Sequence, residues 1–404
     1  MHKFQHLRQQ FPALQRQHNG SNLVFMDGPG GTQVPQSVIN AVSGYYKTSN
    51  ANLHGAFITS QESDEVLDAC RSKMADFLGA EGPHTISFGQ NMTTLNFALS
   101  RAMSRTLQPG DEVLITQLDH EANRGPWLAL RQHGIIVKEV RLLPNGYLDY
   151  GHLTSQLSER TRLLAMGMSS NLTGTVNNIA IAREQTYRVG AQLLLDAVHY
   201  APHYPIDVQT LGCDFLLCSA YKFYGPHIGF LYARPGTLDQ LPTDRLRTAP
   251  QAAPYSIETG TLNHAAIAGV NAALDFIAGF GEGADYKAKL RDAMLQIGLH
   301  EKALLEDLFN GLNGLPGLSI IGPDLSDHRR SPTLAIKVVG KHPKAISEAL
   351  AEKNICAWNG HFYALRATEV LGLLEQGGVT RLGISAYCDD SDTERVIDAF
   401  KGLL

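Results

Sequence analysis

The chain has 404 residues, of which 44% are hydrophobic and 18% are charged, and its formal net charge is -5. This length allows a large buried core and predicts two or three domains, because a domain usually holds roughly 100–200 residues. The small net charge, without any block of like charges, argues against a protein that binds nucleic acid or a membrane surface, so a small molecule is the expected partner.

The cysteines and the hydropathy pattern further limit the kind of protein that this chain can be. The five cysteines are scattered and include no Cys-x-x-Cys pair, so we expect neither a disulfide framework nor a metal site. This usage suits a reducing compartment, and the expected location is the cytoplasm. No apolar stretch approaches the roughly 18–20 residues that a membrane-spanning helix needs.

The first predicted elements are a helix and a short strand. Residues 4–15, FQHLRQQFPALQ, have apolar residues at helical spacing and predict an amphipathic helix. It leads into the apolar stretch NLVFMD at residues 22–27, which we expect to be a strand.

From residue 80 to 235, short apolar runs alternate with loops and with stretches of helical period. Several runs are apolar at consecutive positions, which is typical of strands covered by helices on both faces. Residues 93–107 are one such covering helix, with an apolar stripe at Leu95, Ala98, Leu99 and Ala102. The pattern predicts a mostly parallel, doubly wound α/β sheet. Its seven candidate strands are 84–88, 111–117, 134–143, 162–168, 191–197, 214–219 and 229–235.

The pattern changes after about residue 265. A long helical region is followed by short strands at 318–322, 332–340, 354–359 and 379–385 and by a last helix at 391–404. This order suits a smaller α+β domain. We therefore expect a large domain at residues 20–264 and a small domain at residues 265–404, with residues 1–19 packing against the small one.

Polar residues mark the ends of the predicted strands, where ligands bind in open α/β sheets. The strand at 84–88 continues through Asn91, Met92 and Thr93 into a helix, whose N-terminal amides suit a phosphate, although any capped helix has the same pattern. His120 and Asn171 follow two further strands. By itself, His120 fits an ordinary surface histidine equally well.

Asp196 and Lys222 are unusual because each follows an apolar run. Buried carboxylates need a partner, and a buried lysine can become a nucleophile when its pKa is lowered. The ordinary alternatives are an Asp–Lys ion pair and a lysine whose ammonium group reaches water. Pyridoxal phosphate explains both residues together, because it needs a lysine, an acid near its ring nitrogen, a stacking group and a phosphate cradle.

The chain resembles the class V aminotransferase family of fold-type I pyridoxal phosphate enzymes, in particular its cysteine desulfurase and selenocysteine lyase branch. The likeness runs from FMDGPGGTQVP to TRLGISAYCDD, which is most of the chain. Six motifs carry it in order: NANLHGA, LDHEANRGPW, SSNLTGTVN, LLLDAVHYAPHYPIDVQTLGCDF, CSAYKFYGP and ETGTLN. The resemblance implies the PLP-dependent transferase fold and a homodimer.

The resemblance also implies roles for individual residues. Lys222 would hold the cofactor as a Schiff base and move the substrate Cα proton, Asp196 would pair with the pyridine nitrogen, and His120 would stack on the ring. His54 and Arg381 would contact the substrate, with Arg381 on its α-carboxylate. The other implied cofactor contacts are Asn171, His199, Asn91, Met92, Thr93, Ser219, Tyr221 and, from the partner subunit, Thr261. His199 and Tyr221 stand where the family commonly has glutamine and histidine.

The chain departs from the desulfurase pattern in its small domain. Tyr363 occupies the place of the cysteine that attacks the substrate sulfur, and Trp358 occupies that of an arginine that binds substrate. Cys356 and Cys388 are expected to be structural. The predicted function is therefore C–S cleavage or β-elimination of a cysteine-like amino acid without persulfide transfer. The alternatives are a class V aminotransferase, an amino-acid epimerase, or a non-catalytic protein of the same fold.

Overall fold

The computed structural model describes residues 4, 6–326 and 330–404. Its central sheet has seven strands in the order β4-β10-β9-β8-β7-β5-β6. All strands but β10 run in one direction, and β10 is antiparallel to both of its neighbours. The predicted mostly parallel sheet is confirmed. The strands are β4 (Ile86–Gly89), β5 (Glu112–Thr116), β6 (Ile136–Val140), β7 (Thr161–Gly167), β8 (Gln192–Asp196), β9 (Phe215–Ser219) and β10 (Gly229–Ala233).

The central strands are apolar at consecutive positions because both faces of the sheet are buried. In β8, Leu193 and Leu195 join one hydrophobic core while Leu194 joins the core on the opposite face. This alternation follows from the two-residue period of a strand. Helix α4 (Met92–Ser104) covers the second face with the predicted stripe that includes Leu95 and Leu99.

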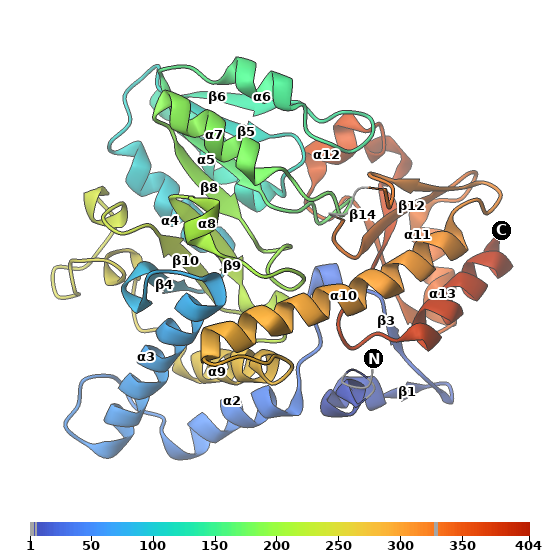
Figure 1. The fold of residues 1–404 in the computed structure, drawn as a ribbon, viewed down its shortest axis with the longest axis horizontal. Helices are drawn as coiled ribbons and strands as arrows, with labels where there is room; N and C mark the ends of the chain where they lie inside the picture. The colour runs from blue at the N-terminus through green and yellow to red at the C-terminus, as the bar shows by residue number, and fades with distance from the viewer. Residues whose placement is uncertain (1–3, 5, 327–329) are drawn as a thin grey trace.

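Helices complete the layers around the sheet (Figure 1). The 27-residue helix α10 (Tyr286–Leu312) packs against α3 and α9 and also against α13 of the C-terminal region. Among the described residues, no helix is long and apolar enough to span a bilayer. The other helices of the large-sheet side are α2 (Gln36–Thr48), α3 (Ile58–Leu78), α5 (Gly125–Leu128), α6 (Tyr150–Gln156), α7 (Ile179–Val189), α8 (Val208–Leu211) and α9 (His264–Ala278).

A second, antiparallel sheet has the order β11-β12-β15-β14. Its strands are β11 (Leu318–Ile321), β12 (Thr333–Val338), β14 (Trp358–Gly360) and β15 (Val379–Gly383), and the helices of this region are α11 (Pro343–Glu352), α12 (Leu365–Val370) and α13 (Asp390–Leu403). The division at residues 264 and 265 stays a prediction. Helix α9 spans this predicted boundary and packs against α2 and α3.

The N-terminal segment differs from the prediction. Instead of an amphipathic α-helix, the structure has two 3₁₀ turns, Leu7–Gln10 and Pro12–Gln15. Phe11 between them is extended, because a proline disfavours helical backbone in the residue before it. The apolar residues are still buried, and Phe11 packs against the rings of Tyr224 and Tyr387. Two short strand pairs follow, β1 (Gln17–His18) with β2 (Ser21–Asn22), and β3 (Val24–Phe25) with β13 (Ile355–Cys356).

Candidate active site

Lys222 lies in a one-turn 3₁₀ helix directly after β9, at the carboxyl edge of the sheet. Its side chain is buried and donates a hydrogen bond to the backbone carbonyl of Pro29. Burial, together with the nearby positive charge of Arg381, lowers the pKa of Lys222 to about 7. The amine is therefore largely neutral just above neutral pH, which a nucleophilic lysine requires.

Asp196 ends β8, the strand next to β9, and lines the same cavity as Lys222. Its carboxylate accepts a hydrogen bond from the Val198 N–H at 2.9 Å. Burial, with a smaller contribution from the negative charge of Asp119, raises the pKa of Asp196 to about 7. A carboxylate in this setting is stabilised by any cation placed against it.

The start of α4 forms another wall of this cavity. Asn91 caps the helix by accepting the Thr94 N–H at 2.9 Å, and the Met92 N–H donates to Ser219 Oγ at 3.0 Å. The hydrogen of the Ser219 hydroxyl remains available to a ligand. Strand β10 passes close to the start of α4 at Gly229. Only glycine fits at this position, because a Cβ there would lie 2.3 Å from the carbonyl carbon of Asn91. The result is a helix N-terminus with adjacent hydroxyl groups, a setting that favours anions.

Two histidines line the cavity in neutral form. Burial lowers the pKa of His120 to about 4, with Lys222 and Arg381 adding to the effect, and its Nδ1 accepts the Ala122 N–H. Burial also holds the pKa of His199 well below its ordinary value. His199 Nε2 lies 3.0 Å from the hydroxyl of Thr333 in β12, so residues from both sheets meet here.

A second cavity adjoins the first and shares six lining residues with it: Thr93, His120, Ala122, Asn171, Tyr221 and Lys222. Arg381 of β15 is buried in its wall and donates to the Asn171 carbonyl at 2.9 Å. Burial lowers the pKa of Arg381 to about 9, so the guanidinium stays charged at neutral pH. The outer cavity is therefore lined both by an amine, from Lys222, and by a group that can bind a carboxylate, from Arg381.

Residues 24–396 match the Aminotransferase class-V family. The chain belongs to this family. It is similar to a probable cysteine desulfurase of Synechocystis sp., at 31% identity over 98% of this chain and 93% of the relative. It is also similar to a cysteine desulfurase of Pectobacterium atrosepticum, at 30% identity over 97% and 95% of the two chains. Among solved structures, an S-sulfonic acid form of a cysteine desulfurase from Escherichia coli matches with a TM-score of 0.86, at 28% identity over 99% and 98%.

Class V aminotransferases are PLP-dependent enzymes, and the groups in the inner cavity fit this cofactor. Lys222 supplies a buried amine with a pKa of about 7, so a large fraction of it is neutral at neutral pH. Asp196 supplies a buried carboxylate that a protonated ring nitrogen would stabilise. The N-terminus of α4 supplies an anion site beside Ser219. Amine, acid and phosphate cradle therefore come from three neighbouring parts of one cavity.

Most of the residues predicted for the class V aminotransferase site come together. The inner cavity is lined by Asn91, Met92, Thr93, His120, Asn171, Asp196, His199, Ser219, Tyr221 and Lys222. Arg381 lines the adjoining outer cavity, and the two remaining predicted residues line neither cavity. Thr261 lines a separate cavity beyond Asn91, and the His54 side chain is 81% exposed and paired with Asp64. Their implied roles stay predictions, and that of Thr261 depends on a second subunit.

The structure adds polar residues that the sequence did not single out. Asp119 is buried in the inner cavity, where its carboxylate accepts the Gly167 N–H at 2.7 Å. Asn177 donates to the Gly167 carbonyl, and its Oδ1 has no hydrogen-bond partner among the described residues. Asp119 carried the same signal as Asp196, a carboxylate at the end of an apolar strand. Asn177 has no such signal, because it reaches the cavity through a loop.

Proposed function

We propose that this enzyme cleaves the bond between Cβ and sulfur in a cysteine-like amino acid by β-elimination, without passing the sulfur to a cysteine of its own. One observation carries the proposal. The two adjoining cavities hold Lys222, Asp196 and Arg381, but among the described residues no cysteine lines either of them. Tyr363 lines the outer cavity instead, and a phenol cannot carry a persulfide.

The positions of the cysteines support this view. Cys70, Cys213, Cys218 and Cys388 are buried, and burial raises the pKa of Cys70 and Cys213 to about 12. Burial also raises the pKa of Cys218 and Cys388. Cys356 is partly buried, with its pKa raised to about 11. The thiolate is the nucleophilic form of cysteine, so all five are poor nucleophiles at neutral pH.

The residues of the two cavities account for the steps of an elimination. Arg381 binds and orients the substrate α-carboxylate through its planar guanidinium group. Lys222, whose lowered pKa of about 7 makes the neutral amine available at neutral pH, accepts the proton from Cα. Pyridoxal phosphate, when bound, supplies the electron sink that makes this proton acidic, and Asp196 would hold its ring nitrogen. The Cβ–S bond breaks, the thiol leaves with a proton, and addition of water yields pyruvate and ammonia.

We also propose that the enzyme works as a homodimer in the cytoplasm. Thr261 supports the dimer, because it lies outside the inner cavity of its own chain and would need a partner to act there. The absence of cysteine pairs suits a reducing compartment.

The test is the product formed by the holoenzyme from L-cysteine, L-cystine and L-cysteine sulfinate. Elimination releases pyruvate and ammonia in equal amounts, and the Lys222→Ala variant should release neither and lack the visible absorption band of the bound cofactor. Alanine together with a protein persulfide would indicate a desulfurase. A keto acid that retains sulfur, with conversion of the cofactor to its amine form, would indicate an aminotransferase. Either result, or no product from all three substrates, would contradict the proposal.

A further inference from the structure

The outer cavity has an aromatic wall. It has a volume of about 660 Å³, within the range of roughly 300–1,000 Å³ that is usual for small-molecule sites. Free cysteine, whose side chain ends at the sulfur, would leave much of it unfilled. The rings that line it come from α4, from β14 and from the loop before α12: Phe97, Trp358, Phe362 and Tyr363.

Phe362 is fixed against the group that we assign to the substrate carboxylate. The guanidinium carbon of Arg381 lies 4.0 Å from the centre of the Phe362 ring, a cation–π contact. The Phe362 carbonyl accepts a hydrogen bond from Asn171 Nδ2 at 2.8 Å. An amino acid held by Arg381 would therefore have an aromatic face beside it.

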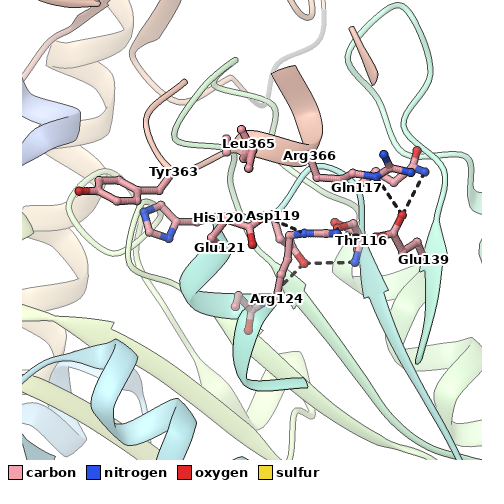
Figure 2. A network of polar contacts seen from close by, with 12 residues as sticks. Thr116, Gln117, Asp119, His120, Glu121, Arg124, Glu139, Tyr363, Leu365 and Arg366 are labelled. Atoms are coloured by element: carbon pink, nitrogen blue, oxygen red, sulfur yellow. Dashed lines mark hydrogen bonds and ion pairs between the residues drawn. The ribbon is translucent and has the colours of Figure 1, made fainter. Parts of the chain in front are cut away.

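The backbone of this loop is strained, which indicates that the positions of the rings matter. Phe362 and Tyr363 have φ angles of +52° and +58°, in the left-handed region that bulky residues rarely adopt. The Tyr363 carbonyl accepts the Glu121 N–H at 2.7 Å, and this contact holds the loop against the residues after β5. The Tyr363 ring lies over His120, with 5.4 Å between ring centres (Figure 2).

Among the described residues, the wall offers no unpaired charge beyond the groups already assigned. Arg366, next to the loop, extends away from the cavity and pairs with Glu139 of β6 at 3.0 Å (Figure 2). Glu121 lines the cavity, but its carboxylate is paired with Arg124 at 3.1 Å. Lys222 and Arg381 are the other charged residues among the described lining. A charged substituent on the substrate would lose hydration here without gaining a partner.

We propose that the preferred substrates are S-conjugates of cysteine with a bulky, uncharged and preferably aromatic group on sulfur. This inference rests on the proposed function and names its substrate class. The aromatic rings of Trp358, Phe362 and Tyr363 line one side of the cavity and would contact the substituent, while Arg381 would hold the carboxylate at the other end of the amino acid. Cleavage releases the substituent as a thiol, with pyruvate and ammonia.

The test compares S-benzyl-, S-methyl- and S-carboxymethyl-L-cysteine with the holoenzyme, measured as pyruvate release. All three release alkyl thiols, so intrinsic leaving-group differences are small. We expect kcat/KM to be about tenfold higher for the benzyl substrate than for either other one, because one aromatic contact is worth up to about a factor of ten. A ratio of benzyl to methyl near one would overturn the inference.

Variants test whether the aromatic wall causes the preference. Trp358→Ala and Tyr363→Ser should each lower the benzyl-to-methyl ratio severalfold, while Tyr187→Ala, at an aromatic residue that is 74% exposed on α7, should leave it unchanged. An equal ratio in all variants would contradict the assignment. Binding of the unreactive 3-phenylpropionate, measured by calorimetry, should be at least about tenfold tighter than that of propionate.

β-Chloro-L-alanine separates the two proposals. It carries a small, good leaving group, and pyruvate release from it needs no aromatic wall. Pyruvate from this substrate with no benzyl preference would overturn the substrate class and leave the proposed elimination standing. No pyruvate from any of the substrates would overturn both.

Discussion

Arg381 Nη1 donates a hydrogen bond to the backbone carbonyl of Asn171 at 2.9 Å and so joins β15 of the small sheet to the loop after β7 of the large one. The Asn171 side chain in turn donates to the Phe362 carbonyl. These contacts lie where the inner and outer cavities meet, since Asn171 lines both. The proposed substrate site is therefore built by the packing of two sheets, and neither sheet forms it alone.

Replacing Arg381 with lysine should lower kcat/KM by about 10–100-fold, because a charged hydrogen bond contributes about 1.5–3 kcal/mol and lysine lacks the planar fork. Calorimetry with 3-phenylpropionate should show weaker binding in parallel. Arg162→Lys, at a partly exposed pair with Asp111, is the matched control and should behave like the wild type. Unchanged carboxylate binding in Arg381→Lys would show that another residue holds this group.

Uptake of pyridoxal phosphate by the cofactor-free enzyme should increase with pH and level off above about 7, because only the neutral Lys222 amine reacts. Arg381→Met removes a positive charge that lowers the pKa of Lys222, so the midpoint of the pH profile of cofactor uptake should move to higher pH in this variant. Asp27→Asn removes a negative charge that raises this pKa, so its inflection should move to lower pH. The rate of recovery of the visible absorption gives the profile. Shifts in the same direction in both variants would contradict this account.

Glu258→Gln should destabilise the fold by about 3–5 kcal/mol, because it leaves a buried guanidinium without its partner. Arg71 binds Glu258 through two hydrogen bonds of 2.7 and 2.8 Å, and both side chains are buried. Urea unfolding measures the change. Glu184→Gln breaks an exposed pair with Arg188 and should cost less than about 1 kcal/mol. Equal losses of unfolding free energy in the two variants would contradict the claim that burial makes the Arg71–Glu258 pair more important for stability.

The two arginines that pair with Glu139 should differ in their effect on stability. Arg124 is buried, bonds to the Thr116 carbonyl and also pairs with Glu121, so Arg124→Met should cost about 3–5 kcal/mol in the free energy of unfolding. Arg366 is 37% exposed, and Arg366→Met should cost less than about 1 kcal/mol. Thermal unfolding of the two variants measures the loss of stability in each. A larger loss of stability in Arg366→Met than in Arg124→Met would contradict this prediction.

Local patterns in the sequence were enough to predict the strands of the central sheet. The leucines before Asp196 and the apolar run before Lys222 indicate buried strands directly, and polar residues at their ends mark the edge where the cavities lie. The N-terminal segment shows the limit of this reasoning. Its apolar spacing suits a helix, but Pro12 imposes an extended residue in the middle and divides the segment into two turns.

The sequence by itself determined the order of the elements and placed Asp196 and Lys222 at strand ends, because burial and alternation leave a signal within a few residues. Only the tertiary structure decided which side chains meet. Arg366 pairs with a glutamate 227 positions away, and the left-handed backbone of Phe362 and Tyr363 is held by Asn171 and Glu121 of the large-sheet side. Such contacts form only when the two sheets pack together, so no local pattern could indicate that an aromatic wall and Lys222 line the same cavity.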